Sequence, residues 1–212
     1  MMFHPMYQLV NAAFVGHMGE TYLAALGLGS LTTGILIISI GSSFALVMGT
    51  LIAPAFGSGE LRFCKVLLYR QMFLNTIVFA IIATPTFFIK DIYRYIGQDP
   101  NIIDLAAQYV WYVTPGAYFG MQAIAVADSA VSMKYTKARL IGNLCGSITH
   151  LLLIIVFVSQ LEMGWRGICL ATSLNFVARF TATWTYINSI KEFSSVTDVS
   201  IFSTETCTNL GF

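Results

Sequence analysis

Long stretches without charge alternate with short charged segments along the chain. The charge-free stretches are Thr21–Gly59, Gln71–Ile89, Leu105–Ala127, Leu140–Leu161 and Gly167–Ile190, the last interrupted only by Arg179. A helix needs about 20 apolar residues to cross a bilayer, so each stretch predicts a transmembrane helix. A sixth apolar stretch, Met6–Val15, is too short to cross, and we expect this first helix to be truncated.

The pattern also predicts how the chain is divided. Residues 1–191 form a transmembrane unit of about six helices, and residues 192–212 form a polar cytoplasmic tail. This tail is rich in Ser and Thr and contains no apolar run long enough to span, so we expect it to be disordered.

Composition excludes a soluble fold. The chain is 57% hydrophobic and only 10% charged, with a mean hydropathy of +0.74, whereas soluble domains carry about 25% charged residues. Surface this apolar needs lipid or a partner to cover it, and together with the predicted spans it leads us to expect a multi-pass integral membrane protein in contact with the bilayer. The net charge of +1 offers no basic footprint for nucleic acid.

The basic residues predict the orientation of the helices. Seven fall on one side of the membrane if the segments alternate: Arg62, Lys65, Arg70, Lys134, Lys137, Arg139 and Lys191. Lys90, Arg94 and Arg166 fall on the other side. Because Lys and Arg are retained in cytoplasmic loops, the first side is predicted to face the cytoplasm.

Several residues have a structural interpretation. Four glycines of the stretch Thr21–Gly59 would let this second helix pack closely on a neighbouring helix; they are Gly27, Gly29, Gly34 and Gly41. Gly57 and Gly59 suit a tight turn between helices. Asp99, followed by Pro100, is predicted to cap the next helix.

Four stretches, taken together, resemble one transporter family. They read VNAAFVGHMGETYLAALGLGSL (Val10–Leu31), APAFGSGELRFCKVLLYRQ (Ala53–Gln71), GQDPNIIDLAAQYVWYVTPG (Gly97–Gly116) and GWRGICLATSLN (Gly164–Asn175). Their order and spacing are similar to those of the multidrug and toxic compound extrusion (MATE) family, in its eukaryotic form. The resemblance covers about Leu9–Ile190.

The resemblance implies an all-α integral membrane protein that forms one lobe of a twelve-helix transporter. Members export organic or xenobiotic solutes by secondary active antiport, with H⁺ or Na⁺ as the coupling ion and no other cofactor. A second six-helix lobe, or a second copy of this chain, would then complete the substrate cavity. Plasma and vacuolar-type membranes are both compatible with this interpretation.

The resemblance also indicates a candidate cation site. Prokaryotic members bind the cation with an aspartate in helix one, polar or acidic residues in helix five and a threonine in helix six; here Asn11, His150 with Ile154, and Thr172 stand at these positions. Only the threonine matches. Eukaryotic members also lack the aspartate, and the resemblance to them implies an essential carboxylate in the second lobe. His150 can titrate between about pH 5 and 8 and is the best local candidate, although a neutral histidine bonded to a neighbouring helix remains open.

Other candidates are less specific. Asp128 is the only carboxylate that falls within a span, and either a cation-site role or a structural role is open. Arg179 is expected to extend toward lipid headgroups, or else to face the cavity. Substrate-cavity candidates are Tyr112, Tyr118, Gln122 and Asn175, for which helix packing or interfacial anchoring is the alternative.

Three other functions differ in what they require of the sequence. A flippase for a lipid-linked intermediate would favour a charged cavity, for which the chain has little charge. A non-transporting fragment, or a subunit that needs a second lobe, is also consistent with the length. A membrane enzyme is not expected, because the sequence lacks GxSxG and HExxH motifs and His4, His17 and His150 are isolated; no metal site is expected either.

Overall fold

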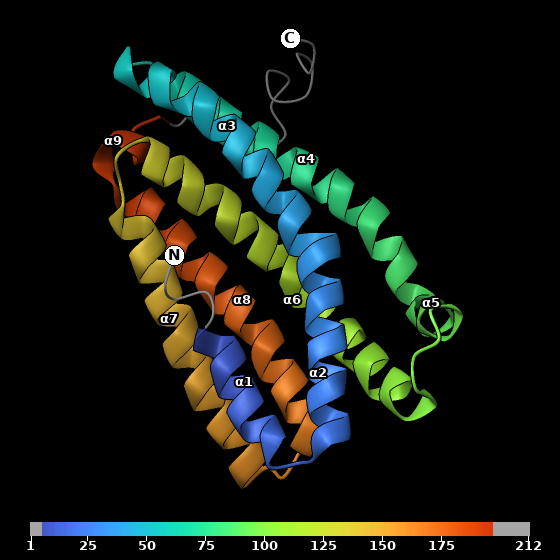
Figure 1. Cartoon of the computed structure of the whole chain (residues 1–212). Coiled ribbons are helices and arrows are strands. Elements are labelled where there is room, and N and C mark those ends of the chain that lie inside the picture. Colours follow the sequence, from blue (N-terminus) through green and yellow to red (C-terminus); the bar gives the residue numbers. More distant parts are fainter. Residues whose placement is uncertain (1–5, 197–212) are drawn as a thin grey trace.

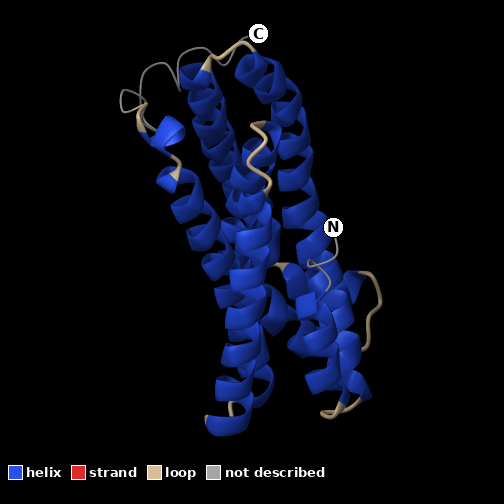
Figure 2. Cartoon of the chain, turned by 90° about the vertical axis from the view of Figure 1, so that its left-hand side faces the viewer, coloured by secondary structure: helices blue, strands red, loops and turns tan. Residues whose placement is uncertain are grey.

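The structure, a computed structural model, describes residues 6–196, and this part of the chain is a bundle of helices joined by short loops (Figures 1 and 2). The elements in chain order are α1 Met6–Gly16, α2 Glu20–Thr33, η1 Gly34–Ser39, α3 Ile40–Gly57, α4 Leu61–Phe87, α5 Ile89–Tyr95, α6 Pro100–Ser132, α7 Lys137–Ile154, η2 Ile155–Gln160, α8 Gly164–Ser189 and α9 Lys191–Ser194. The elements η1 and η2 are π-helical turns that continue α2 into α3 and extend α7.

The helices follow the predicted spans. Three of them are both long and apolar enough to cross a membrane: Glu20–Gly57, Leu61–Phe87 and Lys137–Gln160. The helices α6 and α8 have 33 and 26 residues, long enough to cross but more buried within the bundle. The helix predicted at Met6–Val15 is α1, with 11 residues. The all-α membrane fold predicted from the pattern is therefore confirmed.

Helix α6 lies at the centre of the bundle, between α7 and α8 on one side and α3 and α4 on the other (Figure 1). Its contact with α8 depends on glycine. A Cβ added at Gly116 would lie 2.5 Å from the backbone oxygen of Ser173, and one at Gly120 would lie 2.8 Å from the Phe176 ring. These two helices pack at backbone distance because no side chain separates them.

The glycines of the second span divide into two groups. Gly29 faces Tyr109 at 2.7 Å and Gly41 faces Met121 at 2.1 Å, measured from an added Cβ, so the predicted packing is confirmed for both. At Gly27 and Gly34 nothing lies within 4 Å, so the prediction is wrong for these two within the described residues. They lie on a side of the helix that α6 does not cover.

Two predicted helix boundaries are confirmed. The Asp99 side chain accepts a hydrogen bond of 2.8 Å from the Asn101 amide, with Pro100 in the first turn of α6. Gly59 has a φ of 84° in the turn between α3 and α4. Gly57, predicted to share this turn, is instead the last residue of α3.

The short helix α9 packs against the end of the bundle where α4 begins and α6 ends, which carries most of the basic residues. The buried Lys65 ammonium on α4 donates to the carbonyls of Phe193 at 3.3 Å and Val196 at 2.6 Å. The Tyr135 hydroxyl donates to the Glu192 carboxylate. The first residues of the predicted tail, up to residue 196, are thus docked on the helices, and residues 197–212 lie outside the described residues.

Candidate functional site

Three residues predicted for the cation site meet inside the bundle. The Asn11 amide nitrogen on α1 donates to Thr172 Oγ1 on α8 at 2.9 Å, and His150 Nε2 on α7 lies 3.1 Å from Asn11 Oδ1. All three side chains are buried, with relative exposures of 1% or less. The positions are 139 and 161 residues from Asn11 along the chain, so only the fold brings them together.

The hydrogen bonds that link Ile168, Thr172, Asn11 and His150 all point the same way. The Thr172 hydroxyl donates to the Ile168 carbonyl at 2.8 Å, so its oxygen is free to accept from the Asn11 NH₂ group. The Asn11 carbonyl oxygen must then face His150, whose Nε2 has to donate. Neutral His150 therefore carries its proton on Nε2, and Nδ1 is the position where a further proton would bind.

Burial works against a charged ring here, and two backbone carbonyls work in its favour. Nδ1 is buried and has no hydrogen-bond partner among the described residues. The backbone carbonyls of Tyr7 on α1 and Ala171 on α8 lie beside the ring. The Tyr7 ring meets the His150 ring edge-on, with centroids 5.9 Å apart. These carbonyl oxygens could accept from a protonated ring, whereas the neutral Nδ1 is an acceptor with no donor among the described residues.

Carboxylates do not take part in this site. Within the described residues, no three His, Cys, Asp or Glu side chains gather as a metal would require. The site offers one amide oxygen, one hydroxyl and one imidazole, while a Na⁺ or Ca²⁺ site normally includes carboxylate oxygens. Among these groups the imidazole is the one that can take up a proton.

Two cavities reach the site from either side of α1. One, of about 200 Å³, lies between α1 and α7 and includes Tyr7 and His150 in its lining. The other, of about 320 Å³, lies between α1 and α2 and includes Gln8, Asn11, Ser30 and Tyr109. The His150 end and the Asn11 end of the hydrogen-bond chain therefore open into different spaces.

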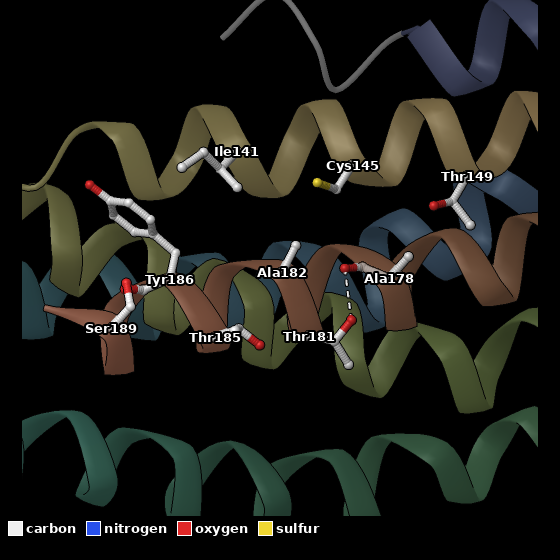
Figure 3. A pocket seen from close by; sticks show the side chains of 9 residues that line it. All are labelled: Ile141, Cys145, Thr149, Ala178, Thr181, Ala182, Thr185, Tyr186 and Ser189. Carbon is white, nitrogen blue, oxygen red and sulfur yellow. Dashed lines mark hydrogen bonds between the residues drawn. The ribbon is translucent and has the colours of Figure 1, made fainter. Parts of the chain in front are cut away.

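A wider groove lies elsewhere, between α7 and α8 (Figure 3). It measures about 530 Å³ and is lined by Ile141, Cys145, Thr149, Ala178, Thr181, Ala182, Thr185, Tyr186 and Ser189. The Thr181 hydroxyl within it bonds to its own helix, donating to the carbonyls of Val177 at 3.1 Å and Ala178 at 3.0 Å. None of the predicted cation-site residues lines this groove.

Asp128 is remote from that cluster and forms an ion pair. Arg139 on α7 donates to the Asp128 carboxylate on α6, where both side chains are partly exposed. Arg179 on α8 adds a second positive charge that attracts Asp128. Asp128 thus joins α6 to α7. The Cβ of Arg179 lies 3.2 Å from a Cβ added at Gly146, so the base of this side chain packs against α7.

The four cavity candidates occupy two different places. Tyr118 and Gln122 lie between α4 and α6, where Gln122 Nε2 donates to the Tyr118 hydroxyl at 3.1 Å. Asn175 is buried one turn after Thr172 on α8, against Gly146 of α7. Tyr112 is half-buried against the core formed by α1, α2, α6 and α8. The structure thus brings only Asn175 near the Asn11 cluster.

Residues that the sequence did not suggest complete both places. Tyr7 packs on His150, and its only signal was its position one turn before Asn11. Gln71 and Asn75 on α4 are completely buried and face the Gln122 region. The sequence signal for this pair was the occurrence of two amide side chains one helical turn apart in an otherwise apolar span, which predicts that they share one helix face.

The chain is similar to several known proteins. Protein DETOXIFICATION 51 of Arabidopsis thaliana is 25% identical over 183 residues, which are 85% of this chain and 34% of that protein. Multidrug and toxin extrusion protein 1 of Danio rerio is 26% identical over 178 residues, 84% of this chain and 30% of that protein. The crystal structure of the eukaryotic MATE transporter AtDTX14 superposes with a TM-score of 0.87 at 18% identity, covering 94% of this chain and 44% of that one.

The length of the match is informative too. The chain spans about a third of the length of these two relatives and less than half of the crystal structure, which corresponds to roughly one lobe. The MatE family model matches residues 1–156, most of the chain. The chain belongs to the MatE family.

Proposed function

We propose that this chain forms one lobe of a secondary active transporter that exports small organic solutes in exchange for protons, with His150 as the proton-binding residue of this lobe. The observation that carries the proposal is the directed hydrogen-bond chain from Ile168 through Thr172 and Asn11 to His150, which leaves Nδ1 free. The relatives named for multidrug and toxin extrusion support export as the direction of transport.

Proton binding at His150 would change how α1 is held. The neutral ring makes one bond to α1, through Asn11. A proton on Nδ1 adds a donor close to the carbonyls of Tyr7 on α1 and Ala171 on α8. Because a ligand shifts an equilibrium only through a difference in affinity between two states, this extra bond favours the state in which α1 is packed against α7 and α8. Loss of the proton would favour release of α1.

A second six-helix unit is part of the proposal. The relatives are about three times as long as the matched region, so a complete substrate cavity would need a second lobe or a second copy of this chain. The cavity between α1 and α2, which Gln8 and Ser30 line, is the surface that such a unit would close. Small organic substrates would bind between the two units.

The test uses transport and a variant that keeps the hydrogen bond. In His150→Gln, the amide NH₂ can still donate to Asn11, but the side chain cannot take up a proton near neutral pH. The full chain is reconstituted in liposomes, and tetraethylammonium movement is followed under a proton gradient and under a sodium gradient. We expect proton-driven movement in the natural chain, a large loss in His150→Gln, and no loss in the neighbouring variant Ser147→Ala.

Two results would contradict the proposal. Proton-driven transport that His150→Gln leaves unchanged would remove His150 from coupling. Transport driven by a sodium gradient alone would show that another group binds the coupling ion. If the chain moves no solute alone, the same measurements are made after co-reconstitution with a six-helix second lobe from a relative, so that coupling is tested in a complete cavity.

A further inference from the structure

A second polar cluster, remote from the Asn11 cluster, lies between α4 and α6. We call it the amide seam; it consists of Gln71 and Asn75 on α4 and Gln122 and Ser129 on α6. Their relative exposures are 0%, 0%, 2% and 1%. Four polar side chains so completely buried in an apolar bundle need hydrogen-bond partners, because each unpaired group retains its desolvation penalty.

Helical spacing places these four side chains along the contact between α4 and α6. Asn75 donates to Gln122 Oε1 at 3.4 Å, which fixes the facing sides of α4 and α6. Gln122 Nε2 in turn donates to the Met72 carbonyl at 3.0 Å. Gln71 is one turn from Asn75 and Ser129 is two turns from Gln122, on the same helix faces. The seam therefore runs along the contact between the two helices.

Much of the hydrogen-bonding capacity of the seam is unused. Among the described residues, Gln71 Nε2, Gln71 Oε1, Asn75 Oδ1 and Ser129 Oγ are buried without a partner. Only Gln122 is well satisfied, through Met72, Thr76 and Tyr118. An unpaired buried polar group retains the cost of its desolvation, so four such atoms together would destabilise the fold.

The unused groups define the chemistry of what binds there. Gln71 leaves both a donor and an acceptor, Asn75 leaves an acceptor, and Ser129 leaves a hydroxyl that can do either. A cation would satisfy the oxygens but would be repelled by the Gln71 NH₂ group, and no carboxylate belongs to the seam. Water both donates and accepts, and it commonly satisfies buried polar groups of this kind.

We propose that the amide seam is an internal hydration site, in which ordered water joins Gln71, Asn75 and Ser129 across the contact between α4 and α6. Helix α6 then has two unlike sides. Its α8 side is a dry contact at backbone distance through Gly116 and Gly120. Its α4 side combines the direct hydrogen bonds of Gln122 with bridging water.

Radical footprinting tests the proposal directly. The full chain in lipid nanodiscs is exposed to a short X-ray pulse, which makes hydroxyl radicals from water and oxidises the nearest side chains. Met72, 7% exposed, follows Gln71, whereas Met121, 0% exposed, packs away from the seam against Gly41. We expect Met72 to be oxidised several-fold faster than Met121, and Gln71→Leu to reduce this difference.

Thermal stability gives the second readout. If water binds Gln71, Gln71→Leu removes hydrogen bonds and should lower the Tm by roughly 2–4 °C, as expected for a loss of one bonded group in a chain of this size. If Gln71→Leu fails to fold, the smaller change Ser129→Ala replaces it, and it should also lower the Tm. A Tm that rises in Gln71→Leu, with Met72 oxidised no faster than Met121, would show a dry seam and overturn the proposal. A cation site would give a different result. Sodium chloride would then raise the Tm, N-methyl-D-glucamine chloride would not, and the effect of sodium would disappear in Gln71→Leu. That result would overturn the hydration proposal.

Discussion

Single side chains determine what the Asn11 cluster can do. An amide can present either its oxygen or its nitrogen to a neighbour, and here Thr172 makes the choice because its own hydroxyl proton is used on Ile168. The orientation of Asn11 then sets the tautomer of His150. A threonine that never touches the imidazole thus controls which nitrogen can take up a proton.

Removing the Thr172 hydroxyl tests this control. Thr172→Val has nearly the same shape but leaves the buried Asn11 NH₂ group without its acceptor, so we expect the chain to lose about 1–3 kcal/mol of stability. Thr172→Ser keeps the hydroxyl and is the matched control, with little loss expected. Denaturation of the purified chain in detergent measures both variants, and equal stability of the valine and serine variants would contradict the directed hydrogen-bond chain.

Tyr135 offers a prediction about alkaline pH. Its hydrogen bond to Glu192, with burial and the carboxylate charge, raises its pKa from 10.0 to about 12. The folded state then holds this proton more tightly than the unfolded state does. The contribution to α9 docking is therefore complete below about pH 10 and is lost as the pH rises toward 12. Absorbance titration of tyrosinate should show a phenol near pH 12 that is absent in Tyr135→Phe and moves back toward 10 in Glu192→Gln.

At the scale of elements, α9 should depend on one lysine. Lys65 donates to two carbonyls at the end of α9, and its ammonium lies 4.8 Å from the Phe193 ring centroid. In Lys65→Met these interactions are lost, so α9 should detach and trypsin should cleave after the exposed Lys191 faster. Lys90→Met is the control, because Lys90 likewise lies over an aromatic ring, that of Trp111, but belongs to α5, where it pairs with Asp104. Equal cleavage of both variants would mean that α9 is held by other contacts.

The contact between α6 and α8 should be the least tolerant of added volume. In Gly116→Ala the new methyl would overlap the Ser173 backbone, at 2.5 Å, and backbone cannot move aside as a side chain can. We expect a loss of about 1–3 kcal/mol. Gly27→Ala, with nothing within 4 Å, should be neutral or stabilising by up to about 1 kcal/mol through helix propensity. Thermal melts of the two variants compare them, and similar melting temperatures would contradict the close packing.

The elements were largely predictable from sequence, and the exceptions have physical causes. Charge-free stretches locate the long helices because lipid tolerates few charges, and the Asp99 cap follows from local chemistry. Hydropathy carries no signal for the π-helical turns at Gly34–Ser39 and Ile155–Gln160, where the change lies in backbone hydrogen bonding. It also missed that Phe193, within the polar tail, is buried.

The candidate site was predictable only in part, because its members come from distant elements. No periodicity links Asn11 to His150 or Thr172; the family resemblance named them, and the fold of the whole bundle places them in contact. The resemblance could not give the direction of the hydrogen bonds, which depends on Ile168. The amide seam follows from neither source, because it requires knowing that α4 packs on α6.

For the whole molecule, the polarity of its outer surface indicates where a second unit would bind. Most exposed side chains of the bundle are apolar, as lipid requires, for example Ile81 on α4 at 67% exposure. The cavity between α1 and α2 is different, because Gln8 and Ser30 line it and the uncovered Gly27 lies beside them. Polar groups facing hydrocarbon are costly, so this surface is predicted to be the one that a second copy or lobe covers.

Cysteine cross-linking tests that surface on the chain as it exists. With Cys145 and Cys207 changed to serine, Ser30→Cys should cross-link two copies in native membranes, since two such surfaces would face each other. Ile81→Cys, on the lipid-facing side of α4, should stay monomeric and serves as the control. Cross-linking that is as efficient at position 81 as at position 30 would mean that copies collide at random. A chain that stays monomeric in both variants would exclude self-association through α2, and the polar surface would then require a different six-helix partner.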